Sequence, residues 1–275
     1  MNTRLTKEDQ AMIKEAKGNK VSGPIYNEDG LRLLKVLGNP EYLEVKNGVK
    51  AICDEACLGL DNLHDVVLPA SVTDLGTRAF ASCIKLFKIT MPGVDFIGIE
   101  SFAHCENLKE IALPETLGKI WKGAFADCKA LEETNIPSHL KIIDKSAFRN
   151  SGLKSLNIVI SEDCKCWIFD RSFAYCKHLE SVYLNKNVKI MDRMVFAGCT
   201  SLKTIEFENP SLTGLIGETD LIAEKNATML IGCTSLEKII VPKNKYNKYP
   251  DFNIQAYESA QFETRDFNSL VTPKE

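Results

Sequence analysis

The chain has 275 residues, of which 44% are hydrophobic and 26% are charged, as in a soluble folded protein with a sizeable core. Its 34 lysine and arginine residues nearly balance 37 aspartate and glutamate residues, so its charge does not favour a nucleic-acid partner. No apolar run reaches the roughly 18 residues that a membrane-spanning helix requires. The first twenty residues lack a signal-peptide pattern, so the chain as given is expected to be cytoplasmic, or secreted or at the cell surface if a leader was removed.

The N-terminal segment carries the signals of a short helix. Thr6 is followed by Asp9 in a capping-box pattern, and Gly18 follows the stretch AMIKEAK. We therefore expect a helix over residues 7–17. Residues 1–39 are assigned to an N-terminal helix and cap that shields one end of the core.

A repeated unit begins near residue 40. Its clearest copies read FASCIKLFKITMP at 80–92, FAHCENLKEIALP at 102–114 and FADCKALEETNIP at 125–137. Eight copies have anchor positions at 57, 80, 102, 125, 148, 173, 196 and 230, and six of the seven steps between them are 22 to 25 residues. The period predicts a repeat domain over residues 40–242 with an insertion near 208–229, followed by a C-terminal cap and tail over 243–275.

Each unit places apolar residues at fixed positions, such as Leu117, Ile120 and Phe125. A unit of about 23 residues cannot bury them all, so stacked neighbours must cover them. The stretch L-x-x-I-x-I alternates at period two, as in a half-buried strand, and a proline such as Pro114 ends it. We expect a mainly β repeat solenoid whose parallel strands, about 4.8 Å apart, form one long sheet.

The pattern A/S-F-x-x-C-x-x-L-x-x-I-x-I-P resembles the BspA-type leucine-rich repeats of bacterial surface proteins and some parasitic protists. The resemblance covers roughly residues 40–242. It implies a right-handed leucine-rich-repeat superhelix with a concave face lined by parallel strands. It also implies a role in binding other proteins or surfaces, including cell-surface or host adhesion.

The cysteines follow the repeat. Six share one position and would form a line with parallel side chains, a geometry that favours buried free thiols over disulfides; they are Cys83, Cys105, Cys128, Cys176, Cys199 and Cys233. Cys164 and Cys166 lie outside this line, in a C-x-C pair among charged residues. Such a pair leaves open a soft-metal or redox role, although no third ligand is near it in the sequence.

No catalytic set emerges from the motifs. His104 adjoins Cys105, but other copies place serine, aspartate, asparagine, tyrosine or glycine at the same position, which indicates an exposed turn residue. No nucleophile elbow, dinucleotide-binding loop or phosphate-binding loop occurs. We therefore predict no enzyme activity, no metal site and no cofactor.

The outward-facing strand positions remain available for function. We predict that they bind a partner, and they include Lys88, Thr90, Glu110, Glu133, Asn135, Ser155, Asn157, Ser181, Tyr183, Thr204 and Glu206. The predicted function is a monomeric, non-catalytic scaffold for a protein or a cell-surface ligand. Two alternatives stay open: a redox- or metal-responsive protein that uses Cys164 and Cys166, and a purely structural repeat protein that self-assembles.

Two aromatic residues stand at a repeat position that is small or charged in other copies. Trp121 and Phe169 occupy the position held by Gly98 elsewhere. A bulky aromatic there is either exposed or covered by a neighbour, and Trp167 is a candidate cover for it. Local packing is the favoured interpretation.

Overall fold

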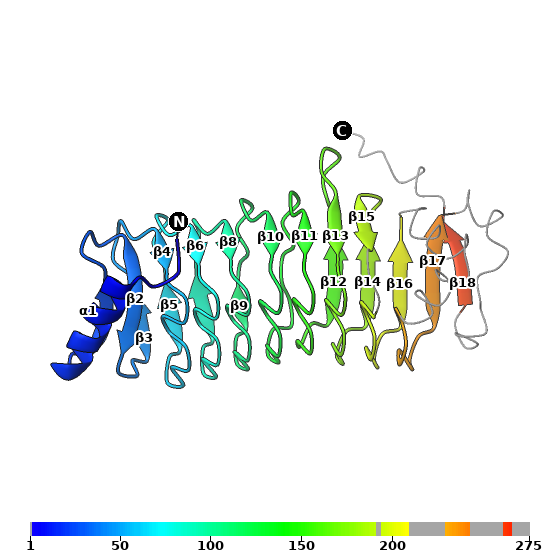
Figure 1. The fold of residues 1–275 in the computed structure, drawn as a ribbon. Helices are drawn as coiled ribbons and strands as arrows, with labels where there is room; N and C mark the ends of the chain where they lie inside the picture. Colours follow the sequence, from blue (N-terminus) through cyan, green and yellow to red (C-terminus); the bar gives the residue numbers. More distant parts are fainter. Residues whose placement is uncertain (1, 191–193, 209–228, 243–260, 266–275) are drawn as a thin grey trace.

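The structure is a computed structural model that describes residues 2–190, 194–208, 229–242 and 261–265. The chain winds into successive coils that form an elongated array, with helix α1 (Lys7–Gly18) at its N-terminal end (Figure 1). This is the predicted β-solenoid. Nearly all of the predicted insertion near residues 208–229, and most of the predicted tail, lie outside the described residues.

One side of every described coil up to residue 190 contributes a short strand to a nine-stranded sheet. Strand β1 pairs antiparallel with β2, and all later pairs are parallel. The strands in order are β1 (Gly23–Tyr26), β2 (Arg32–Leu37), β4 (Ala51–Ile52), β6 (Asp74–Leu75), β8 (Phe96–Ile97), β10 (Lys119–Ile120), β11 (Ile142–Ile143), β13 (Cys166–Ile168) and β15 (Val188–Ile190).

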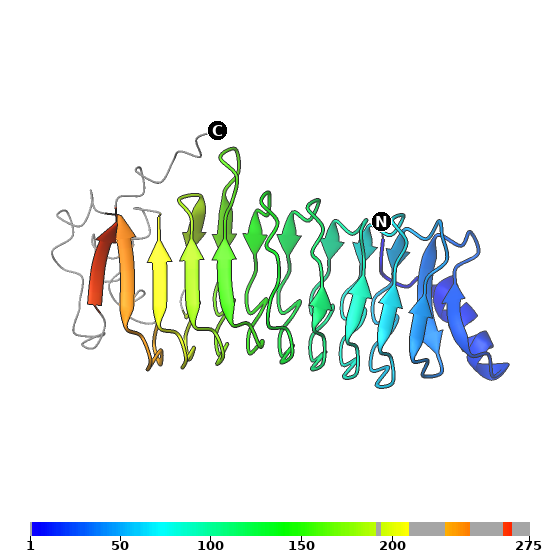
Figure 2. The ribbon, with the colours of Figure 1, turned by 180° about the vertical axis from the view of Figure 1, so that it is seen from behind.

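The opposite side of the coils carries the strands that the repeat predicted, and Figure 2 brings these strands to the front. They form two parallel sheets: β3 (Tyr42–Glu44), β5 (Asp65–Val67), β7 (Lys88–Thr90) and β9 (Glu110–Ile111), then β12 (Ser155–Ile158), β14 (Ser181–Leu184), β16 (Thr204–Phe207), β17 (Lys238–Pro242) and β18 (Gln261–Arg265). We call their outward surface, with residues 132–136 between them, the strand face. The expectation of one long sheet is wrong, because residues 132–136 form no strand and because the nine-stranded sheet lies opposite.

A run of turns around each anchor residue completes the coil. In one copy Glu100 and His104 have φ of 54° and 61°, in the left-handed region that favours glycine. In a later copy the position of His104 is held by Gly198, with φ of 72°. The N–H groups of Phe102 and His104 donate to the next coil, to the carbonyl oxygens of Ala124 and Ala126, both at 2.8 Å. These bonds pair buried backbone groups without a strand.

Stacked side chains fill the space between the two layers. Six anchor phenylalanines, Phe80, Phe102, Phe125, Phe148, Phe173 and Phe196, are fully buried with neighbouring ring centroids 5.2 to 5.6 Å apart. All ten cysteines are free, which confirms the thiols predicted for the six-member line; five of those six are buried and Cys233 is half-buried. Each thiol of the predicted line donates to a backbone carbonyl of the preceding coil, as Cys128 Sγ does to Phe102 O at 3.2 Å.

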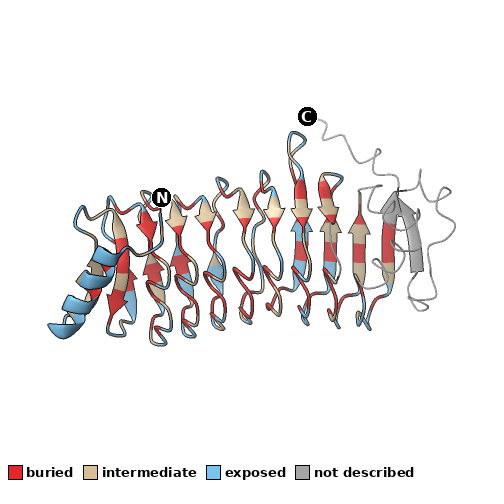
Figure 3. Ribbon diagram, viewed as in Figure 1, coloured by how far each residue is buried: buried red, intermediate tan, exposed pale blue. Residues whose placement is uncertain are grey.

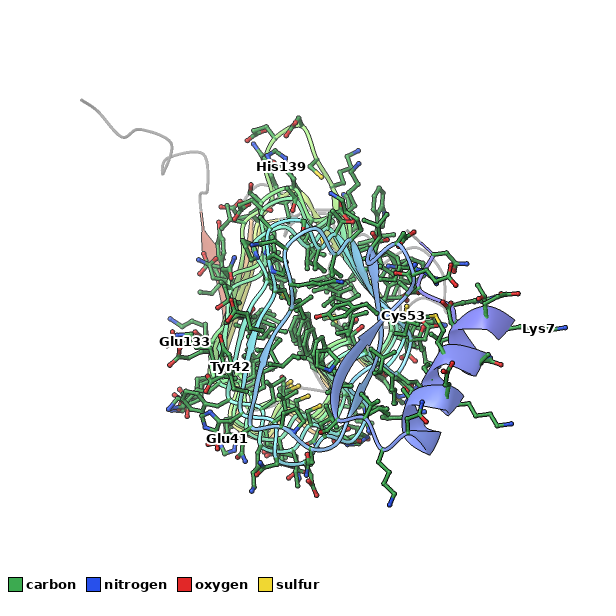
Figure 4. The ribbon with its side chains drawn as sticks, turned by 90° about the vertical axis from the view of Figure 1, so that its left-hand side faces the viewer. Lys7, Glu41, Tyr42, Cys53, Glu133 and His139 are labelled. Carbon is green, nitrogen blue, oxygen red and sulfur yellow. The ribbon has the colours of Figure 1, made fainter. Side chains whose placement is uncertain are left out.

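The predicted N-terminal helix is confirmed together with its capping box, in which Asp9 N–H donates to Thr6 Oγ1. Ile13 packs on Leu34 and Cys53, a cluster separate from the main core. Asp9 also accepts two hydrogen bonds from Arg32 at 2.8 and 2.9 Å. Helix α1 therefore covers the outer face of the first strands of the nine-stranded sheet, on the side opposite Glu133 (Figure 4).

Trp121 lies on the same outer face and packs locally. Its ring contacts that of Phe96 in the preceding coil, with centroids 5.5 Å apart, and Lys119 Nζ lies 3.3 Å from the centre of the Trp121 ring. Lys119 also pairs with Asp144 at 3.3 Å. The aromatic partner of Trp121 is thus Phe96, not the Trp167 that the sequence suggested.

Candidate functional site

The strand face presents the predicted binding residues on its outward side. Buried and exposed residues alternate along its strands, as in β12, where Ser155 and Asn157 are exposed and Leu156 and Ile158 are buried (Figure 3). The parallel register aligns Ser155 with Ser181 and Thr204, and it aligns Asn157 with Tyr183 and Glu206. Eight of the eleven predicted residues are exposed, and Tyr183, Thr204 and Glu206 are half-buried.

A groove of about 950 Å³ lies in the middle of the strand face. It spans β7, β9, residues 132–136 and β12. Seven of the predicted residues line it: Lys88, Thr90, Glu110, Glu133, Asn135, Ser155 and Asn157. The other four, Ser181, Tyr183, Thr204 and Glu206, are not among its lining residues. The sequence did not single out Lys109, Ile111, Ile136 and Val159, which also line it.

The floor of the groove coincides with the break between the two sheets. Thr134 stands where other copies carry a buried aliphatic residue, and its hydroxyl oxygen is buried without a hydrogen-bond partner. The Asn135 amide accepts from Leu113 N–H at 3.0 Å and donates to Leu113 O at 2.8 Å. The side chain of Asn135 therefore occupies backbone groups of the preceding coil at this point, where residues 132–136 form no strand.

Charged side chains border the groove. Lys88 Nζ lies 2.7 Å from Glu110 Oε2, and the hydrogen bond to Glu110 raises the pKa of Lys88. Lys154 and Glu132 form a second pair at 2.7 Å, and the hydrogen bond from Lys154 lowers the pKa of Glu132. All four side chains are solvated, so these pairs organise the rim but add little to folding stability.

A second, smaller hollow of about 210 Å³ adjoins the groove. His64, Lys85, Phe87, Asn107, Lys109 and Ala130 line it. The rings of His64 and Phe87 stack with centroids 5.4 Å apart and an interplanar angle of 12°. The signal in the sequence was Phe87 itself, an aromatic residue at a repeat position that later copies fill with lysine or glutamate.

Tyr183 is less available than its aromatic character suggested. Its hydroxyl donates a hydrogen bond to Glu208, which also accepts from Lys186 N–H at 3.2 Å. The ring is half-buried on β14. Tyr183 therefore helps to hold the end of the neighbouring coil.

The two cysteines of the C-x-C pair have different environments: Cys164 lies in the loop before β13, and Cys166 lies in the core. Cys166 is buried in β13, and burial raises the pKa of its thiol to about 12. Cys164 is half-buried, and its Sγ lies 3.4 Å from His139 O. Because the thiolate is the reactive form, the environment of Cys166 disfavours redox and metal chemistry at neutral pH.

The remaining histidine and cysteine pair does not form a catalytic arrangement. His104 is exposed and lies 3.7 Å from Asp127, whereas Cys105 is buried and its thiol donates to Phe80 O at 3.1 Å. Throughout the described ranges, no three His, Cys, Asp or Glu side chains are placed to hold one metal ion. The described helix α1 is far shorter than a membrane span.

Comparison with known families decides the classification. A model of the BspA type leucine rich repeat region (6 copies) matches residues 37–154, 95–218 and 153–272. The chain belongs to the BspA-type leucine-rich repeat family. The family resemblance seen in the sequence is therefore confirmed, and this BspA-type protein has the strand-lined solenoid that the resemblance implied.

Several solved structures of bacterial leucine-rich repeat proteins are similar to this BspA-type protein. The leucine rich repeat protein of T. pallidum is 21% identical, with 90% of this chain and 98% of that chain covered and a TM-score of 0.47. A leucine rich cell surface protein of Faecalibacterium prausnitzii is 18% identical over 90% of this chain and 93% of its own, with a TM-score of 0.39. At these identities the similarity concerns the fold alone. No curated protein gives a significant match.

Proposed function

We propose that this protein is a non-catalytic scaffold that binds a partner protein, or a ligand at a cell surface, through its strand face. The observation that carries the proposal is the groove of about 950 Å³, which is lined by seven outward residues that have no role in the core. Membership of a repeat family whose members generally act as scaffolds supports the same function. Adhesion to a cell surface is the biological role that we propose for this binding.

The chemistry of the groove suits recognition. Across the described structure, the side chains of Ser155 and Asn157 form no hydrogen bond with the protein, so their donors and acceptors are available to a partner. Apolar surface from Ile111, Ile136 and Val159 lies among them. Strands β7, β9 and β12 on the two sides of the groove belong to hydrogen-bonded sheets, so the sides are preorganised and less entropy is lost on binding.

The test compares two variants of the whole chain. The face variant carries Glu133→Ala, Ser155→Ala and Asn157→Ala. The control carries Lys122→Ala, Lys141→Ala and Lys145→Ala, three exposed residues outside the groove lining. Each protein is immobilised and exposed to intact cells and to extracted surface proteins of its source, and retained proteins are identified by mass spectrometry.

The proposal expects a specific retained protein that the face variant loses and the control keeps, with both variants unfolding near the wild-type temperature. Equal retention by the face variant and the wild type would place the binding surface elsewhere on the molecule.

A further inference from the structure

One row of residues runs along the strand face beside the groove, and we call it the charge row. Its members each follow the buried leucine of a repeat, and in chain order they are His64, Phe87, Lys109, Glu132, Lys154, Glu180, Lys203 and Glu237. Backbone bonds join all neighbouring members except Lys109 and Glu132, as when Lys154 N–H donates to Glu132 O at 3.0 Å and Glu180 N–H donates to Lys154 O at 2.8 Å. Neighbouring members therefore lie one coil apart.

The lysines of this row pair with the member one coil before them. Lys154 lies 2.7 Å from Glu132, and Lys203 lies 3.0 Å from Glu180. Lys109 follows the same geometry, but the member before it is Phe87, which has no charge. Within the described residues Lys109 therefore forms no ion pair, whereas the other two lysines of the row, Lys154 and Lys203, each pair with a glutamate.

The other neighbour of Lys109 in the row is Glu132, and the charge of Lys109 contributes, after the hydrogen bond from Lys154, to lowering the pKa of Glu132. Glu132 follows Lys109 in the row, but no backbone bond joins these two residues, in contrast to the pairs on either side. The carboxylate of Glu132 is already paired with Lys154. Among the described residues Lys109 thus forms no direct ion pair, and it lines the groove.

Lys109 also stands at the boundary between the two hollows. It lines both the groove of about 950 Å³ and the hollow of about 210 Å³. In the smaller hollow its neighbours are the stacked rings of His64 and Phe87. A cation therefore adjoins an aromatic surface at one edge of the groove.

We propose that this corner, Lys109 with the Phe87 hollow, binds a segment of the partner protein in which an Asp or Glu side chain adjoins an aromatic side chain. The inference rests on the proposed function and specifies what the partner must present. The carboxylate pairs with Lys109, as the glutamates of the charge row pair with Lys154 and Lys203. The aromatic side chain enters the smaller hollow and packs against Phe87, because offset or edge-to-face ring contacts are favourable.

The experiment selects binders from a phage-displayed library of random 12-residue peptides on the immobilised full chain. Enriched peptides are synthesised, and their affinities are measured for the wild type, Lys109→Glu, Phe87→Ala and Lys203→Glu. Lys203→Glu is the matched control, because it reverses a charge in the same row outside both hollows. Thermal unfolding verifies that each variant is folded.

The proposal expects enriched peptides with an acidic residue beside an aromatic one. Lys109→Glu and Phe87→Ala should each weaken binding by roughly tenfold, the effect of losing one good contact, while Lys203→Glu changes it less than about twofold. A peptide whose acidic residue is replaced by lysine should bind Lys109→Glu better than it binds the wild type. This charge exchange distinguishes direct pairing from a structural effect of the variant.

Three results would overturn the inference. In the first, peptides lose affinity for the face variant (Glu133, Ser155 and Asn157 to alanine) but bind Lys109→Glu as well as the wild type. The groove would then remain a binding site, and Lys109 would not be part of it. Peptides insensitive to every strand-face variant would count against the proposed function as well. A library that yields no peptide above the empty surface would reject a short acidic and aromatic segment as the ligand.

Discussion

The thiol of Cys105 donates a hydrogen bond to the carbonyl oxygen of Phe80, one coil earlier, at 3.1 Å. The same bond recurs along the array, for example from Cys128 to Phe102 and from Cys199 to Phe173. Cysteine therefore fits this turn as a small buried side chain that also satisfies a carbonyl of the neighbouring coil. Its repetition reflects packing between coils and not reactivity.

Buried thiols predict a loss of stability in alkaline solution. Burial raises the pKa of Cys83 from 9.0 to about 12, so above pH 9 the unfolded chain releases this proton while the native chain retains it. The stabilisation is present in full below pH 9 and is lost as the pH rises toward 12. Urea unfolding at pH 7, 9 and 10 measures the decline. The free energy of unfolding of Cys83→Ala should fall less steeply with pH than that of the wild type. Identical slopes would contradict a raised pKa for the Cys83 thiol.

The phenylalanine stack predicts a large cost for a mid-array truncation. Phe125→Ala removes ring contacts with both Phe102 and Phe148 and leaves a cavity in a fully buried position. We expect a loss of about 3–5 kcal/mol in the free energy of unfolding. Ile84→Ala, at a residue that is 43% exposed, serves as the control and should change stability by less than about 0.5 kcal/mol. Chemical denaturation followed by circular dichroism makes the comparison.

The buried hydroxyl of Thr134 predicts a stabilising substitution. Thr134→Val keeps the shape of the side chain and removes a buried polar group without a hydrogen-bond partner. We expect the free energy of unfolding to rise by about 1–2 kcal/mol. A decrease would show that the hydroxyl is hydrogen-bonded in solution. Thr90→Val, at an exposed position on the same face, is the comparison.

The Asp9 and Arg32 pair predicts that α1 is anchored by charge as well as by Ile13. Asp9 is 3% exposed and accepts two hydrogen bonds from Arg32. Arg32→Met should cost about 3–5 kcal/mol, because it leaves the buried Asp9 carboxylate without its charged partner. Hydrogen exchange should then increase in α1 before it increases in β5 or β7. Uniform exchange across the chain would argue that the helix is not a separately anchored element.

The proposed monomer predicts a molecular mass that does not depend on concentration. Light scattering coupled to size exclusion should give one chain of 30.7 kDa at every loading. A mass that grows with concentration would instead favour the self-assembling alternative. Lys7→Glu with Glu8→Lys, in the exposed first turn of α1, leaves the net charge unchanged and controls for general charge effects.

Sequence reasoning located the strand-face residues but not the groove among them. The repeat assigned Glu110, Glu133 and Asn157 to the outward side, because period-two alternation indicates which residues face the core. The alternation could not predict the hydrogen bonds of the Asn135 amide with the backbone of Leu113, since that contact depends on one side chain and one neighbouring coil. The groove opens where that exception occurs.

The nine-stranded sheet could not be predicted from the repeat pattern either. Most of its strands, such as β6 and β8, contain two residues, too few for an alternation to be visible. The position of α1 was undetermined for a related reason. Its capping box defines a helix locally, whereas the surface that it covers depends on Leu34 and Cys53, which come together only when the coils stack.

The sequence by itself determined the repeat, the family, the line of thiols and the side of each strand that faces outward. These follow from apolar spacing, because every coil must bury the same positions against its neighbours. The tertiary structure alone decided the break at residues 132–136, the hydrogen bond of Tyr183 to Glu208 and the lack of a direct ion pair at Lys109 among the described residues. Those features depend on which side chains meet between adjacent coils, and a repeat pattern describes the average coil and not its exceptions.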